Sequence, residues 1–315
     1  MFTKAVFIGF PDNEVPSGVM ERLGKLVSAH QLISNSDPNL KATIADAEVI
    51  FCRISTTVDK EVIDAAPNLK YIGVLATSFD KIDIEYAKEK GIAVCNLGGY
   101  STEAVAEFTF AVLFEQIREL ERAKNQARAG DYSFDKFMCS ELKDKTLGVL
   151  GAGRIGGRIA EIGLGIGMKV IYFNRSDKPN LDARGAQKKG LDEVLSESDV
   201  ISVNLALNDQ TNRILSREKI NLINNGGILI NTASTKLIDM EALVDRAEKG
   251  EITGIFDHVD LMDPDSASVL LKTPNIIVYP PIAFRTKEAD EARWETFISN
   301  LEMFSQGHPQ NVVNQ

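Results

Sequence analysis

The sequence predicts an α/β protein built from two doubly wound, Rossmann-like domains, each organised around a parallel sheet. Short runs rich in β-branched and aromatic residues alternate with helical stretches along the whole chain, and this alternation is typical of βαβ units. Most of the runs are almost uninterruptedly apolar, as expected of parallel strands that are covered on both faces. Ten runs are more than one ordinary open sheet holds, and 315 residues suit two domains. The predicted strands are Ala5–Phe10, Glu48–Arg53, Tyr71–Ala76, Ile92–Asn96, Thr146–Gly151, Lys169–Asn174, Asp199–Leu205, Gly227–Asn231, Gly254–His258 and Asn275–Tyr279.

Two long helices are predicted as well. The first runs from Ser101, a suitable N-cap, to about Gly130. Its front half, Ala104–Phe114, is apolar nearly all round and should be buried, whereas its back half is charged, so it is a candidate link between the two domains. The second helix, Lys287–Phe304, carries the single Trp294 and closes the chain.

Composition and charge narrow the classes of function. The 35 Lys and Arg residues against 45 Asp and Glu residues give a net charge of −10, which argues against a nucleic-acid partner. No apolar stretch approaches the ~20 residues that span a bilayer, and the N-terminal apolar run is too short for a signal peptide. Cys52, Cys95 and Cys139 show no metal-ligand spacing, so we expect free thiols, no metal and a cytoplasmic location.

A glycine loop follows the predicted strand at 146–150. Gly151-Ala152-Gly153-Arg154-Ile155-Gly156 has the GxGxxG spacing and leads into a helix, with another strand, Lys169–Phe173, behind it. Gly151 permits the tight turn, Gly153 lets the backbone approach a pyrophosphate, and Gly156 lets the helix pack on the strand. The free N–H groups of the helix N-terminus then face the phosphates, so the segment predicts dinucleotide binding.

The end of the second strand of this unit favours NADP(H) over NAD(H). NAD sites usually place a carboxylate there for the ribose 2′-hydroxyl, but this chain reads Asn174-Arg175-Ser176. Arg175 can pair with a 2′-phosphate and Ser176 can donate a hydrogen bond to it. The alternative is that Arg175 is only a solvated residue, and the nearby Asp177 keeps that alternative open.

Taken together, these segments resemble the D-2-hydroxyacid dehydrogenase family over essentially the full length, most closely its glyoxylate/hydroxypyruvate reductase branch. The order and the spacing of the matching segments also agree with the family. The matching segments are Pro67–Asp83, Gly91–Glu107, Leu142–Gly156, Ser198–Leu207, Gly227–Leu237, Gly250–Asp257 and Pro280–Ala289.

The resemblance implies a substrate domain of residues 1–99 and 284–315, a dinucleotide-binding domain of residues 100–283, and a homodimer formed through the coenzyme domains. It places Thr102 near the nicotinamide, Leu205 and Ala206 beside the adenosine, Thr232 and Ala233 along the nicotinamide ribose, and Asp257 on the carboxamide. It also implies that the backbone of Ala76, Thr77 and Ser78 receives the substrate carboxylate, although Ser78 replaces a usual glycine.

Three positions depart from the family pattern. The substrate-binding Arg is replaced by Ser234, and the proton-donating His is replaced by Pro281. The position of the Glu that tunes this His holds Met262, with Asp263 one residue later as a substitute only if the loop carries an insertion. General acid catalysis contributes about 10²–10⁴-fold, so the usual mechanism cannot operate with these side chains.

Four other residues are candidates for the missing roles. Lys236 can supply positive charge, His258 can act as a displaced acid, and Arg285 and Arg53 can bind an anionic group of the substrate. Each has a purely structural alternative: a surface lysine, a histidine packed behind its strand, or an arginine in solvent. For Arg53 we favour function, because it ends a strand at the edge where α/β sheets bind ligands.

Two interpretations follow. The first is an NADP(H)-dependent oxidoreductase that transfers hydride between the nicotinamide and a small carbonyl or hydroxy substrate, using a non-standard active site. The competing interpretation, which the three substitutions motivate, is a catalytically silent NADP(H)-binding regulator or scaffold on the same fold.

Overall fold

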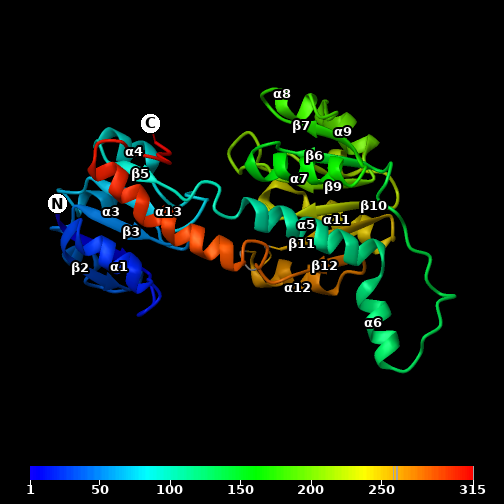
Figure 1. The fold of residues 1–315 in the computed structure, drawn as a ribbon, viewed down its shortest axis with the longest axis horizontal. Helices are drawn as coiled ribbons and strands as arrows, with labels where there is room; N and C mark the ends of the chain where they lie inside the picture. The colour runs from blue at the N-terminus through cyan, green and yellow to red at the C-terminus, as the bar shows by residue number, and fades with distance from the viewer. Residues whose placement is uncertain (258, 260–261, 315) are drawn as a thin grey trace. The chain divides into compact units, whose positions relative to one another are not determined.

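The computed structural model describes residues 1–257, 259 and 262–314. The chain divides into two compact units. Unit 1 comprises Met1–Ser101 and Thr286–Gln315, and unit 2 comprises Thr102–Arg285. Each unit is a parallel sheet covered by helices (Figure 1), so the predicted fold class is confirmed.

Unit 1 has a five-stranded sheet in the order β2-β1-β3-β4-β5, and all its neighbouring strands pair in parallel. The strands are β1 Phe2–Ile8, β2 Val27–Ile33, β3 Val49–Cys52, β4 Tyr71–Val74 and β5 Ala93–Cys95, and the helices are α1 Ser17–Gly24, α2 Leu40–Ile44, α3 Lys60–Asp64, α4 Ile84–Glu89 and α13 Lys287–Ser305.

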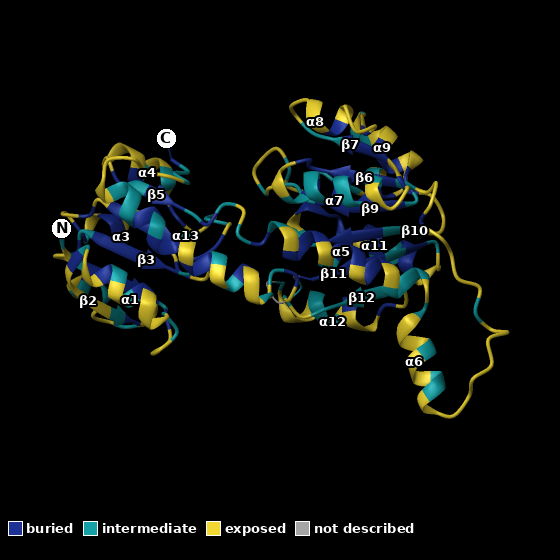
Figure 2. Cartoon of the chain, viewed as in Figure 1, coloured by how far each residue is buried: buried dark blue, intermediate teal, exposed yellow. Residues whose placement is uncertain are grey.

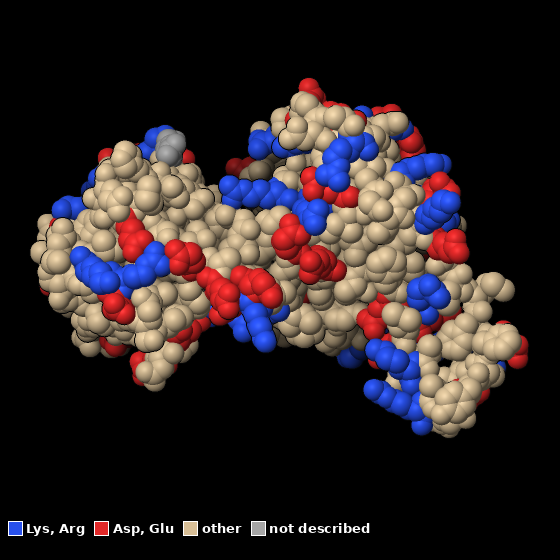
Figure 3. Space-filling model, in the orientation of Figure 1, with Lys and Arg blue, Asp and Glu red and all other residues tan. Residues whose placement is uncertain are grey.

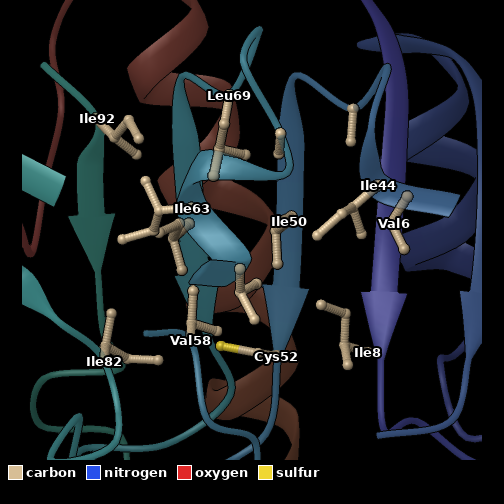
Figure 4. Close-up of a cluster of buried hydrophobic side chains, with 14 of the residues drawn as sticks. Val6, Ile8, Ile44, Ile50, Cys52, Val58, Ile63, Leu69, Ile82 and Ile92 are labelled. Carbon is tan, nitrogen blue, oxygen red and sulfur yellow. The ribbon is translucent and has the colours of Figure 1, made fainter. Parts of the chain in front are cut away.

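Successive residues of the unit 1 strands point to opposite faces of the sheet, so alternate residues pack into two separate apolar cores. On one face Ile8 and Ile50 pack with Ile44 of α2, as Figure 4 shows. On the other face, Phe51 lies 4.5 Å, ring centre to ring centre, from Phe297 of α13. Both layers are buried, which explains the apolar strand sequences.

The C-terminal segment covers the edge strand β5. Val312 forms an antiparallel bridge with Cys95. The buried Asn314 accepts a hydrogen bond from the Val94 backbone N–H (3.0 Å) and donates one to the Ile92 carbonyl (2.8 Å). An edge covered in this way is not open to pairing with another chain.

Unit 2 has a seven-stranded parallel sheet in the order β12-β11-β10-β9-β6-β7-β8. The strands are β6 Thr146–Leu150, β7 Lys169–Phe173, β8 Gln187–Lys188, β9 Val200–Val203, β10 Gly227–Asn231, β11 Ile252–Phe256 and β12 Ile276–Val278. The helices are α5 Thr102–Ile117, α6 Leu120–Arg128, α7 Arg154–Gly165, α8 Pro179–Asp182, α9 Leu191–Glu197, α10 Arg217–Ile220, the 3₁₀ turn η1 Thr235–Leu237, α11 Met240–Glu248 and α12 Pro264–Lys272.

Helices α5 and α7 pack on one face of this sheet, and α9, α10 and α11 pack on the other. Figure 2 shows buried strands between more exposed helices within the unit. Figure 3 shows acidic and basic side chains interspersed on the visible face of each unit. Among the described residues, no helix is long and apolar enough to cross a membrane, and no group of potential metal ligands is found.

The structure corrects two details of the predicted elements. It contains strands β2 and β8, which the sequence pattern did not reveal: β2 buries only Val27 and Ile33, and β8 has two exposed residues. The single helix predicted from Ser101 to Gly130 is broken, because α5 ends at Ile117 and Glu119 adopts a left-handed φ of 47°. The carbonyl of Ile117 accepts a hydrogen bond from the distant Ser140 N–H (3.2 Å).

Candidate dinucleotide site and catalytic positions

The glycine loop between β6 and α7 has the geometry that phosphate binding requires. Gly151 has a φ of 92°, and a Cβ there would lie 2.7 Å from the Asn204 carbonyl oxygen of the loop after β9. A Cβ on Gly156 would lie 2.1 Å from the Gly151 carbonyl oxygen, so only glycine lets α7 begin this close to the turn. The space around Gly153 is open, which leaves room for a ligand against its backbone.

The N-terminus of α7 is available to an anion. Gly153 is the N-cap and offers no side chain to the first-turn N–H groups, and the first turn carries no acidic residue. Arg154 is exposed and Ile155 is half-buried. The first-turn N–H groups and the helix dipole can therefore stabilise a pyrophosphate.

The loop sits where the order of strands reverses. Strand β6 has β7 on one side and β9 on the other, although β9 comes later in the chain. Open α/β sheets bind ligands at this switch point, beyond the carboxyl ends of the strands.

The turn after β7 exposes positive charge. Arg175 and Ser176 are exposed, and Asn174 donates hydrogen bonds to the Ser176 carbonyl (2.9 Å) and hydroxyl oxygens (3.1 Å), which shapes the turn. Asp177 forms an ion pair with Lys188 of β8 (2.6 Å), whose ammonium group holds the pKa of Asp177 below its usual range. Among the described residues, no carboxylate forms an ion pair with Arg175.

The remaining candidate cofactor residues also follow strands of this sheet. Leu205 and Ala206 follow β9, and Thr232 and Ala233 follow β10, where the Asn231 amide bonds both the N–H and the carbonyl of Ala233 (3.2 and 3.0 Å). Thr102 is the half-buried first residue of α5.

Asp257 has a structural role that the sequence did not reveal. Its side chain is buried after β11, and its Oδ1 accepts hydrogen bonds from the backbone N–H groups of Ile282 (2.9 Å) and Ala283 (3.1 Å). Asp257 therefore fixes the loop that carries Pro281. Binding of the nicotinamide carboxamide by Asp257 stays a prediction.

The positions at which the family resemblance predicts substitutions are occupied by residues with local roles. Ser234 caps η1 by accepting a hydrogen bond from the Lys236 N–H (3.3 Å). Pro281 is half-buried, as is Met262. Asp263 caps α12, and the hydrogen bonds from the hydroxyl and backbone N–H of Ser266 hold its pKa below the usual range.

The candidate replacement residues lie in different surroundings. Lys236 is exposed on η1. Arg285 is exposed, with its guanidinium carbon 6.0 Å from the ring centre of Phe284. His258 lies outside the described residues.

In unit 1, Arg53 follows β3 and forms a 2.5 Å ion pair with Glu14, which follows β1. Sequence reasoning missed Glu14, since nothing local marks a partner 39 residues away. The segment Ala76–Thr77–Ser78 follows β4. The Ala76 carbonyl accepts a hydrogen bond from the Leu97 N–H (2.9 Å), and the Thr77 hydroxyl donates one to the Leu97 carbonyl (3.2 Å). The Asn96 side chain donates a hydrogen bond to the Thr77 carbonyl (2.6 Å).

Comparison with known proteins identifies relatives over most of the chain. Residues 110–283 match the sequence model described as D-isomer specific 2-hydroxyacid dehydrogenase, NAD binding domain. A glyoxylate reductase of Thermococcus litoralis is 34% identical over 281 residues, which cover 86% of this chain and 85% of that protein. A hydroxypyruvate reductase of Blautia hydrogenotrophica is 31% identical over 303 residues, which cover 94% of each.

Two solved structures resemble the whole chain. A D-lactate dehydrogenase from Aquifex aeolicus, complexed with NAD and lactic acid, has a TM-score of 0.88 at 30% identity and covers 99% of each chain. An acyclic imino acid reductase in complex with NADPH and D-Arg has a TM-score of 0.87 at 30% identity, covering 99% of this chain and 100% of that one.

A glycine loop at the switch point of a doubly wound sheet defines a protein that binds a dinucleotide. The chain belongs to the D-isomer specific 2-hydroxyacid dehydrogenase family. This family consists of pyridine-nucleotide-binding oxidoreductases that act on CH–OH groups, and the predicted likeness to glyoxylate and hydroxypyruvate reductases is confirmed.

Proposed function

We propose that the chain is an NADP(H)-dependent oxidoreductase that transfers hydride between the nicotinamide and a small, 2-oxo-acid-like carbonyl or hydroxy substrate. The turn after β7 carries the coenzyme preference. Arg175 is exposed there, and the carboxylate of Asp177, two residues later, is paired with Lys188. A 2′-phosphate gains a guanidinium and the Ser176 hydroxyl at this turn, whereas a bare ribose lacks its customary acidic acceptor.

The family resemblance and the local geometry support a separate role for each unit. Unit 2 binds the coenzyme, which supplies or accepts the hydride, and unit 1 binds the substrate. The pyrophosphate is held by the loop and by the first turn of α7, and the ribose phosphate by the turn after β7. The residues assigned to the coenzyme are Gly151, Gly153, Arg154, Ile155, Gly156, Asn174, Arg175, Ser176, Thr102, Leu205, Ala206, Thr232, Ala233 and Asp257.

Proton transfer and substrate binding need residues other than those of the usual family pattern. Ser234 and Pro281 offer neither the charge nor the exchangeable imidazole proton of the residues they replace. We assign the anion-binding role to Lys236 and Arg285, and the proton-donor role to His258. Arg53, whose guanidinium is paired with Glu14, is assigned a contact to the substrate. Asp263 is ionised as the cap of α12, so it contributes negative charge and not a proton.

Steady-state oxidation of NADPH and NADH tests the coenzyme preference. Glyoxylate, hydroxypyruvate, pyruvate and several uncharged carbonyls are offered at high enzyme concentration, and binding of both coenzymes is measured by calorimetry. Arg175→Met should weaken NADPH binding by about 10- to 100-fold, the value of a charge-assisted hydrogen bond, with little effect on NADH. Lys188→Met should lower the same preference because it releases the charge of Asp177.

Arg184→Met is the matched control, since Arg184 is an exposed arginine of the same unit that pairs with Glu161. Equal affinity of the wild-type protein for both coenzymes would overturn the NADP(H) assignment. Tight coenzyme binding without turnover of any carbonyl would instead support the silent regulator or scaffold.

Reduction of a C=N bond is a second candidate reaction, favoured by the replacement of the proton donor with Pro281. A protonated imine already carries the proton that a ketone must receive, so hydride addition at carbon gives the amine without a general acid. The acyclic imino acid reductase shows that this fold type is found with NADPH and an amino acid. NADPH oxidation that requires a 2-oxo acid together with an amine would establish this reaction, and oxidation with the 2-oxo acid alone would exclude the need for it.

We also propose that the protein is a cytoplasmic homodimer joined through its coenzyme domains. No residue of α6 is buried, and the segment after it leaves Tyr132, Phe134 and Met138 at least 80% exposed. Figure 1 shows this segment projecting from unit 2. Large apolar side chains gathered on one projecting segment mark an interaction surface. Phe134→Ser with Tyr132→Ser should shift the sedimentation coefficient to that of the monomer, and a monomeric wild-type protein would contradict the assembly.

A further inference from the structure

At the carboxyl ends of the unit 1 strands, Arg53 and Glu14 form an ion pair that the family resemblance did not indicate. Strand β3 lies between β1 and β4, with Ile8 opposite Cys52 and Cys52 opposite Val74. Arg53, the next residue after Cys52, therefore lies between the loop after β1 and the segment that begins at Ala76.

The arginine is firmly placed at this edge. Its backbone N–H donates to the Thr56 hydroxyl oxygen (3.3 Å), and its carbonyl accepts from the Thr56 N–H (3.0 Å). Thr56 is itself buried, and its hydroxyl donates to the Asn35 side-chain oxygen (2.8 Å). The turn is thus tied to the adjoining strand loops.

The guanidinium of Arg53 is already neutralised. Nη1 lies 2.5 Å from Glu14 Oε2, and the two side chains retain only 33% and 21% of their exposure. Screening by solvent is weaker for a half-buried pair than for a surface pair. A ligand that arrives here meets an acid and a base together, and not an isolated positive charge.

We propose that Glu14 and Arg53 form the subsite for the part of the substrate distal to its carbonyl, and that Glu14 sets its specificity. This inference rests on the proposed function. A hydroxyl or ammonium group can donate to the free lone pairs of the Glu14 carboxylate while the ion pair stays intact. A second carboxylate or a phosphate is repelled by Glu14, so the subsite selects 2-oxo acids with a hydroxyl or amino substituent over dianionic ones.

Glu14→Gln tests the selection because it removes the charge and keeps the shape of the side chain. The ratio of kcat/KM for oxaloacetate to kcat/KM for hydroxypyruvate should rise at least about tenfold, since like charges brought together discriminate strongly. Adding Arg53→Met should abolish that gain. Glu21→Gln is the matched control, because Glu21 is an exposed acid of the same unit that pairs with Lys25 (3.4 Å). Its ratio should equal that of the wild type.

An unchanged ratio in a folded Glu14→Gln protein, with circular dichroism like that of the wild type, would overturn the subsite. Glu14→Ala serves as a second variant if the first does not fold. A wild type that reduces no 2-oxo acid would refute the proposed function but not the subsite. In that case calorimetric titration of malate and glycerate decides: tighter malate binding by Glu14→Gln supports the subsite, and unchanged binding refutes it.

Discussion

Gly156→Ala is the sharpest test of the phosphate loop. The added Cβ would lie 2.1 Å from the Gly151 carbonyl oxygen and 3.0 Å from Val149 Cγ1. Cβ atoms in proteins do not approach other atoms closer than 3.0 Å, so the start of α7 must move by at least 3.0 − 2.1 = 0.9 Å from β6. Overpacking of this kind costs about 1–3 kcal/mol, and the gain in helix propensity of about 1 kcal/mol recovers only part of it.

Gly157→Ala is the matched control, since it is the next residue of the same helix and a Cβ there meets nothing within 4 Å. Both variants gain the same helix propensity, so urea unfolding followed by circular dichroism should show Gly156→Ala less stable than Gly157→Ala by the overpacking cost of about 1–3 kcal/mol. NADPH binding should fall in the first variant alone, because the start of α7 and the turn at Gly151 can no longer keep the spacing that the pyrophosphate needs. Equal stability of the two variants would refute the close packing of α7 on the loop.

Three further predictions concern other parts of the chain. Gly153→Ala fills open space, so its stability should stay within about 0.5 kcal/mol of the wild type while calorimetry shows weakened NADPH binding; unchanged binding would argue against a pyrophosphate there. Arg246→Met should cost about 3 kcal/mol in urea unfolding, because the buried guanidinium donates to the Ile220 and Ile223 carbonyls (2.8 and 2.7 Å) and bonds Glu251 (2.9 Å), and a cost below 1 kcal/mol would contradict this. Glu48 has its pKa lowered to about 2, chiefly by Lys70 and also by the Thr3 backbone N–H and hydroxyl, so its contribution is full above its ordinary pKa of 4.5 and is lost as the pH falls towards 2. Glu48→Gln should therefore be less stable than the wild type by about 1–2 kcal/mol at pH 7, with a difference that disappears near pH 2; a constant difference would contradict this assignment.

Much of the fold could be predicted because strands buried on both faces must be apolar throughout. Strand β2 escaped prediction for the converse reason: it lies at the sheet edge, and Ser28, His30 and Gln31 face solvent between its two buried ends. The break in the predicted first helix escaped as well. It is accompanied by a hydrogen bond from Ser140 back to Ile117, a contact that no local pattern encodes.

In the candidate site, too, local features could be predicted from the sequence and long-range contacts could not. The glycine loop is a local strand–turn–helix, so its spacing predicts its structure. The Lys188 partner of Asp177 and the Glu14 partner of Arg53 come from other strands or their loops. The order of the strands decides which charged side chains meet, and no single segment of the sequence reveals that order.

The predicted substitutions at the catalytic positions are compatible with an intact fold, because the loops around them are held by other groups. Asp257 fixes the loop at 280–283 through the N–H groups of Ile282 and Ala283, neither of which depends on the side chain at position 281. Ser234, at the position where the resemblance predicts an arginine, caps η1. Proline has no N–H to donate, and this loop does not require one from Pro281. The fold therefore persists whichever proton donor is used.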